Sequence, residues 1–179
     1  MFKLANLYEM FKPADNPTQI TDYAVIIGGT RYAGDYGAGL IVLSLVNSQV
    51  LTSSAKRFIA VDSDFSINET SIIQQNFQLD CYKRNSENAT DIEAYSEALK
   101  IQEWLKSFYV KEYLAKKDAQ ILPNYANIVF ANELIDGVFI NRAIFEFSIV
   151  SKVLINEADI GIETIRYQTK LLEGLKNGD

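Results

Sequence analysis

Residues 71–82 read SIIQQNFQLDCY, and apolar and polar side chains alternate along them. One face is apolar apart from Gln75, and it carries Ile73, Phe77, Leu79 and Cys81. The opposite face is polar, and it carries Gln74, Asn76, Gln78 and Asp80. Because successive side chains of a strand point to opposite faces, this alternation predicts a β-strand with one buried face and one face in water.

An amphipathic helix is predicted to follow this strand and to continue to residue 108. Asn88 and Thr90 are both suitable N-caps for it. Its predicted buried stripe, in which Gln102 is the polar member, comprises Ile92, Tyr95, Ala98, Leu99, Leu105 and Phe108. Residues 110–117 are compatible with a second, short helix.

A very long strand is predicted near the C-terminal end. Residues 127–131 are strand-like, a turn over residues 133–137 ends in Asp136-Gly137, and residues 138–155 alternate again. The apolar face of this last segment carries Phe139, Ala143, Phe145, Phe147, Ile149, Val153 and Ile155. The other face is dominated by Arg142, Glu146, Ser148 and Lys152. Since strands have about five or six residues on average, we expect this one to be bent by a bulge or to extend beyond the sheet.

The sequence pattern in the first third of the chain predicts one short helix and three strands. Residues 2–11 have helical spacing of apolar side chains, and Pro13 and Pro17 end that helix. A glycine-rich loop covers residues 28–39, and a polar loop is predicted at residues 62–68. The strands are expected at residues 23–27, 40–51 and 57–61, the second of them apolar on both faces and hence central in its sheet.

Composition excludes several classes of protein. The net charge is −6 with a pI near 4.8, which disfavours a surface built to neutralise nucleic-acid phosphates. The single cysteine excludes an intrachain disulfide. No apolar run approaches the roughly 20 residues that span a bilayer, and the N-terminal residues do not read as a secretory signal. We therefore expect no membrane partner.

The usual catalytic and metal-binding residues are missing. The chain has no histidine, which removes Ser-His-Asp catalysis and most transition-metal sites. Gly29 and Gly34 have the spacing of P-loop glycines, but Asp35 and Tyr36 follow where lysine and serine or threonine are required. Cys81, on the apolar face of its strand, is expected to be a core residue. We predict no catalytic, cofactor-binding or metal-binding residues and no cofactor.

The glycine-rich loop has two readings, a flexible hairpin loop or a contact loop. Arginine and tyrosine are favoured at protein interfaces. The candidate residues for a subunit interface are Arg31, Tyr32, Asp35 and Tyr36.

Several segments resemble the bacteriophage neck/tail terminator, or tail completion, family. Residues 74–82 have that family's strand pattern of polar-Gln-x-Phe followed by alternating apolar residues and Tyr, and they lead into the helix at 89–108. Residues 141–149, NRAIFEFSI, resemble its later strand that begins with arginine. The glycine-rich loop matches in position, although the family usually has a proline-containing loop there. The resemblance covers residues 4–165.

The expected fold is α+β: a twisted, mainly antiparallel sheet with one long amphipathic helix and shorter helices packed on one face. We expect one domain over residues 1–179, with an N-terminal helix and connector at 1–18 and a C-terminal tail at 166–179.

The resemblance implies a structural virion protein, made in the bacterial host cytoplasm, that forms a ring of subunits, often six. The ring lies at the head-proximal end of the tail tube, stops tube growth and joins the tail to the head. The implied partners are further copies of the chain, the tail tube protein and the head–tail connector proteins. DNA would pass through the ring without sequence-specific binding. Two alternatives stay open: a small cytoplasmic ligand-binding or adaptor domain with a pocket between helix and sheet, and an enzyme that uses only carboxylates or tyrosine.

Overall fold

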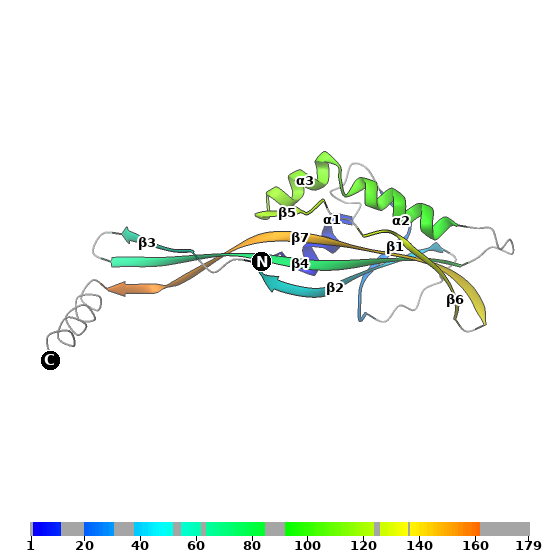
Figure 1. Cartoon of the computed structure of the whole chain (residues 1–179), viewed down its shortest axis with the longest axis horizontal. Helices are drawn as coiled ribbons and strands as arrows, with labels where there is room; N and C mark the ends of the chain where they lie inside the picture. Colours follow the sequence, from blue (N-terminus) through cyan, green and yellow to red (C-terminus); the bar gives the residue numbers. More distant parts are fainter. Residues whose placement is uncertain are drawn as a thin grey trace. The chain divides into compact units, whose positions relative to one another are not determined.

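The computed structural model describes residues 2–11, 20–30, 38–51, 55–61, 64–84, 92–123, 126–135 and 137–161. In chain order (Figure 1), its elements are α1 (Leu4–Phe11), β1 (Ala24–Ile27), β2 (Leu40–Val50), β3 (Ala55–Val61), β4 (Asp64–Arg84), α2 (Glu93–Trp104), α3 (Phe108–Ala115), β5 (Ala119–Ile121), β6 (Val129–Ile135) and β7 (Val138–Gly161). The chain forms two compact units, residues 1–49 with 73–151 and residues 50–72 with 152–179. The predicted tail at 166–179 and the connector after α1 lie outside the described residues.

The sheet of the first unit is mixed. Its strands follow the order β1-β2-β4-β7-β5, and β6 also pairs with β7. β1 is parallel to β2, whereas β5 and β6 are antiparallel to β7. β4 and β7 also run in opposite directions. Asp80 of β4 contacts Arg142 of β7, and Asn76, which comes earlier in β4, contacts Ser148, which comes later in β7. The predicted α+β class is therefore confirmed.

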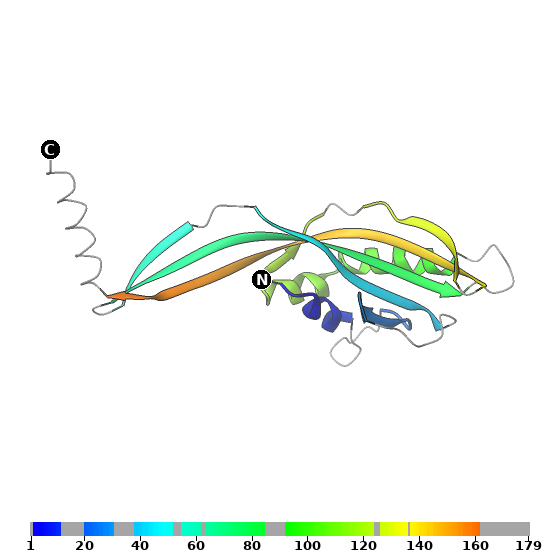
Figure 2. The same cartoon turned by 90° about the horizontal axis from the view of Figure 1, so that it is seen from below.

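One face of this sheet carries the hydrophobic core. Its strand residues alternate along the chain and include Ile41, Leu43, Phe77, Leu79, Cys81, Ala143, Phe145, Phe147 and Ile149. The same cluster takes in buried side chains of α1, α2 and α3, of which Met10, Ala98, Ile101 and Leu114 are examples. Figures 1 and 2 show α2 and α3 following one another along the sheet. The apolar face predicted for residues 71–82 is confirmed, because every apolar member from Phe77 onward is fully buried. The opposite face is less wet than predicted, since Asp80 is 3% exposed.

The predicted helix at 89–108 is shorter than expected, and the second short helix predicted at 110–117 is present as α3. α2 ends at Trp104, and α3 begins at Phe108 with Ser107 as its N-cap, whose Oγ accepts a hydrogen bond from Val110 N. The residue that precedes α2 is Ile92, which has no side-chain cap; the predicted caps Asn88 and Thr90 lie outside the described residues. A turn at residues 105–107 separates the two helices, because the Ser107 cap starts a new helix at Phe108.

The buried stripe of α2 also differs from the prediction. The helix buries Ala94, Ala98, Ile101 and Trp104. Of the predicted stripe, Ala98 and Leu105 are fully buried and Tyr95 packs against the core, whereas Ile92, Leu99 and Phe108 are exposed. Two of the buried residues are alanines, whose small side chains let the helix approach closely. The prediction is therefore right for Ala98, Leu105 and Tyr95 and wrong for the other three apolar members.

Two predicted loops are shorter than expected. β6 continues to Ile135, and its register with β7 ends at Ile135↔Val138, so only two residues separate the two strands. Gly137 has a φ of +78°, which suits a tight hairpin. In the second unit, β3 pairs antiparallel with the start of β4 down to Val61↔Asp64. The predicted loop at 62–68 is wrong from residue 64 onward, because pairing with β3 satisfies the backbone of this polar stretch.

Candidate functional site

The four predicted interface residues, Arg31, Tyr32, Asp35 and Tyr36, lie outside the described residues. Both ends of their loop are described. Gly28 N donates a hydrogen bond of 2.7 Å to Leu43 O, and Ala24 N donates one of 3.1 Å to Gly39 O. Because these bonds join parallel strands, the loop is a crossover from the end of β1 to the start of β2, and the hairpin reading is wrong.

Glycine is required where this loop enters β2. Gly39 has a φ of +86°, and a Cβ at that position would lie 2.5 Å from the ring of Tyr23. A side chain there would be strained and would collide with the ring. The exit of the loop is therefore held in a defined conformation.

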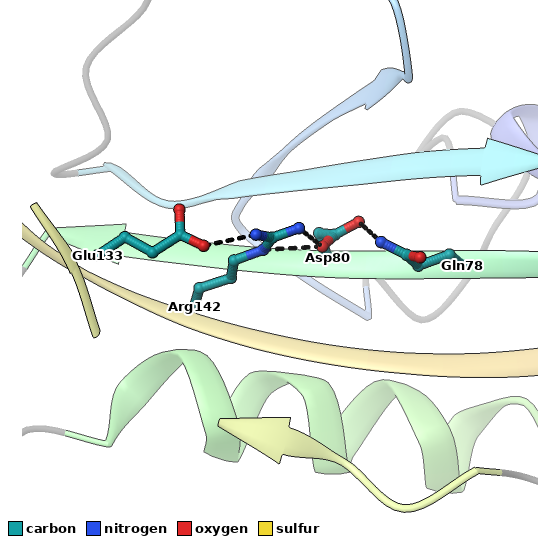
Figure 3. Close-up of polar contacts among 4 residues, drawn as sticks. All are labelled: Gln78, Asp80, Glu133 and Arg142. Carbon is teal, nitrogen blue, oxygen red and sulfur yellow. Dashed lines mark hydrogen bonds and ion pairs between the residues drawn. The ribbon is translucent and has the colours of Figure 1, made fainter. Parts of the chain in front are cut away.

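A cluster of charged and polar side chains lies on the sheet face opposite the core (Figure 3). Arg142 of β7 donates to Asp80 Oδ1 of β4 from Nε at 3.0 Å and from Nη2 at 2.7 Å. Its Nη1 donates to Glu133 of β6. Gln78 Nε2 donates to the second oxygen of Asp80 at 2.8 Å, and the guanidinium lies 5.3 Å from the ring centroid of Tyr82. One arginine thus joins three strands.

The electrostatics of this cluster favour a permanent ion pair. Burial acts to lower the pKa of Arg142, but hydrogen bonds from its guanidinium to Glu133 and Asp80 outweigh burial and raise that pKa above its usual range. The side chain of Asp80 is 5% exposed and that of Arg142 is 25% exposed. Because the arginine is already bound by two carboxylates of its own chain, the cluster serves to hold β4, β6 and β7 in register.

The same face carries a second polar contact between β4 and β7. Ser148 Oγ donates to Asn76 Oδ1 at 2.7 Å, and Gln74 Nε2 donates to the same oxygen at 3.0 Å. The polar faces of both strands were predicted from the sequence. Their pairing was missed, because alternation gives the face of each side chain and not its partner on another strand.

Features that would indicate a ligand site are few in the part of the chain that the structure describes. An open groove of about 490 Å³ lies between α2 and the segment before β6, and Tyr95, Leu99, Gln102 and Ile128 are among its lining residues. Within the described residues, no three acidic or cysteine side chains are grouped to hold a metal ion, and no helix is long and apolar enough to cross a membrane. Burial raises the pKa of the Cys81 thiol far above its ordinary value, and the nearby Glu97 and Asp80 add to the effect, so this thiol is unsuited to act as a nucleophile.

Comparison with protein families decides the identity. The model of the phage neck terminator protein family matches residues 17–174, which is most of the chain. The chain belongs to this family. A search of curated proteins gave no match. As a neck terminator, the protein is a structural component of the phage virion in the tail and neck, which confirms the resemblance found in the sequence.

Exposed apolar side chains of this neck terminator gather at two edges of the sheet in the first unit. On β2, Leu45 and Val46 are 43% and 47% exposed. On β6, Val129 and Leu134 are about 60% exposed, and Leu134 lies opposite the equally exposed Phe139. The sequence predicts neither surface, because its pattern favours a central strand at residues 40–51 and a buried Phe139. Residues 45–49 lie beyond the reach of β1, and Phe139 lies beside the hairpin turn, so neither is covered.

Proposed function

We propose that this neck terminator forms a closed ring at the head-proximal end of the tail tube, where it stops tube growth and joins the tail to the head connector. The observation that carries the proposal is the family match over residues 17–174. The partners are further copies of the chain, six in our proposal, the tail tube protein and the connector proteins. The protein has no catalytic role in this assignment.

The surface of the first unit supports such a ring. A closed ring of identical subunits uses a head-to-tail contact in which one surface of each copy meets a different surface of the next. The exposed apolar residues of β2 and β6 lie at two different edges of one sheet. Exposed apolar clusters on a folded protein commonly mark contacts with partners.

The charge supports passage of DNA through the ring without retention. A net charge of −6 offers no general attraction to phosphates. Arg142, on the uncovered face of the sheet, is bound by Asp80 and Glu133 and is therefore not free to hold a phosphate. DNA would therefore slide through without being held.

The loop residues Arg31, Tyr32, Asp35 and Tyr36 remain our proposal for a second contact between subunits. Alanine substitutions at Arg31 and Tyr36 would weaken assembly without a change in thermal stability if this proposal holds. Equal stability and equal assembly would remove the loop from the interface.

The test is to interrupt the gene with a stop codon in the phage and to examine particles by negative-stain microscopy. We expect filled heads beside unattached tails of uncontrolled length, and recovery when the wild-type chain is supplied from a plasmid. Intact, infectious particles with tails of normal length would overturn the proposed function.

A further inference from the structure

The second half of β2 has an unpaired edge in the first unit. β1 pairs with β2 only from Leu40 to Leu43, and no other described strand follows on that side. Residues 45–49 are all exposed. Their backbone N–H and C=O groups on this side are therefore available to another strand.

β6 has a second unpaired edge on the far side of the sheet. Along Val129–Ile135, β6 pairs with β7 on one side, and no described strand pairs with its other side. Since β4 and β7 lie between β2 and β6, the two edges face away from each other (Figure 2).

Neither edge carries the features that normally prevent pairing. Proteins block exposed edges with lysine, proline or inward-pointing charges. Residues 44–51 read SLVNSQVL and contain no charge and no proline. The one charged residue of β6 is Glu133, and Arg142 neutralises it. The two edges are thus electrostatically compatible in a protein whose net charge is −6.

Both edges also carry apolar side chains on each of the two faces of the sheet. On the core side of the sheet, Leu45 continues the row of Ile41 and Leu43, and Phe130 and Leu134 are the corresponding apolar residues of β6. On the opposite side, Val46 corresponds to Val129. A strand pair between these edges would bury apolar side chains on both faces.

We propose that the β6 edge of one subunit pairs with the β2 edge of a second copy, so that the sheet continues from subunit to subunit. The inference rests on the proposed ring and names the strands that close it. Backbone hydrogen bonds provide the contact, and the apolar side chains on the two faces fix its register.

Cysteine cross-linking in assembled particles tests this pairing. Phage with the interrupted gene is complemented with the double variant Val46→Cys/Val129→Cys, and particles are treated with a short bis-maleimide. We expect a ladder of covalent oligomers on denaturing gels. Each single variant alone should give no cross-link, and particles that contain both single variants should give dimers only. Native Cys81 does not interfere, because it is buried.

Two controls make the result specific. The pair Val46→Cys/Lys111→Cys places the second thiol on the exposed surface of α3 and should give no ladder. Val46→Lys should block the edge and abolish plaque formation, whereas Ser96→Lys on the exposed surface of α2 should not. Both variants should melt like the wild type.

The outcomes separate the two proposals. Dimers from Val46→Cys alone would mean that like edges meet, and this would overturn the β2–β6 pairing. Infectious particles that contain the double variant but give no ladder would also overturn it, while the terminator role stands. Normal particles without any copy of the chain would overturn the proposed function and the pairing with it.

Discussion

The two faces of the sheet in the first unit hold the same strands together by different physics. On the core face, β4 and β7 contribute large apolar side chains, among which Phe77 and Phe147 stack at 5.8 Å between ring centroids. On the opposite face, the same two strands are joined by an ion pair and a Ser148–Asn76 hydrogen bond. Apolar contacts are strong but tolerate small shifts, whereas charge-assisted hydrogen bonds, such as the two from Arg142 to Asp80 Oδ1, depend on geometry. The comparison suggests that the core face supplies most of the stability and the polar face specifies the register.

The largest effect is expected from a cavity in the core face. Phe77→Ala should lower the free energy of unfolding by about 3–5 kcal/mol, because it removes a fully buried ring that contacts Phe2 and Phe147. Chemical denaturation at a fixed protein concentration measures this change. Phe108→Ala is the matched control, since that ring is 80% exposed, and it should change stability by less than about 0.5 kcal/mol. Equal effects of the two substitutions would refute the assignment of the core.

A smaller loss is expected when the ion pair of the polar face is broken. Asp80→Asn should cost roughly 2–3 kcal/mol, because the nearly buried carboxylate that accepts two charge-assisted hydrogen bonds from Arg142 becomes neutral. Arg142 keeps Glu133 as an ion-pair partner, which limits the loss. The double variant Asp80→Asn/Arg142→Met should lose less than the sum of the two single variants. Strict additivity in this double-mutant cycle would show that the two residues are not coupled.

The buried thiol on the core face makes stability depend on alkaline pH. The pKa of Cys81 is raised by burial in the folded state, so the unfolded chain releases its proton first as the pH rises. The sign is therefore a loss of stability, about 1.4 kcal/mol for each pH unit above an unfolded pKa of about 8.5. Denaturation of the wild type and of Cys81→Ala between pH 8 and 10 should show the steeper fall in the wild type. Parallel curves, or rapid labelling of the native thiol, would contradict the burial of this group.

The smallest effect is expected to be a gain, at the polar residue that interrupts the core face. Gln75 is buried, and its Oε1 has no hydrogen-bond partner. Gln75→Met should raise the free energy of unfolding by about 1 kcal/mol, because the desolvated amide oxygen is removed. Gln78→Met on the polar face is the control and should destabilise, because it removes the hydrogen bond to Asp80. A loss of stability in Gln75→Met would indicate that this amide makes a necessary contact.

Much of the fold was predictable because it depends on local patterns. The alternation in residues 71–82 and 138–155 predicted β4 and β7 and assigned Phe77 and Phe147 to the buried face. The Asp136-Gly137 signal predicted the β6–β7 turn. The strands at 23–27 and 40–51 were predicted, but the parallel pairing of β1 with β2 was not, since nothing local distinguishes a crossover loop from a hairpin loop.

The candidate surfaces were less predictable. Alternation assigned Phe139 to the buried face, and only the end of the sheet at the hairpin leaves it exposed. The two free edges depend on where β1 stops and on which side of β7 the β6 strand lies. The interface loop was selected from its residue types alone, and its role stays a prediction.

By itself, the sequence of this neck terminator determined the type of each long element and the face that each long strand buries. Successive side chains of a strand point to opposite faces, and apolar side chains avoid water, so local alternation is enough to identify the buried face. The tertiary structure decided which residues on different strands meet, which stripe of α2 is buried and which edges stay open. These features are set by contacts between residues far apart in the chain, such as Asp80 with Arg142, and no local pattern encodes such a pair.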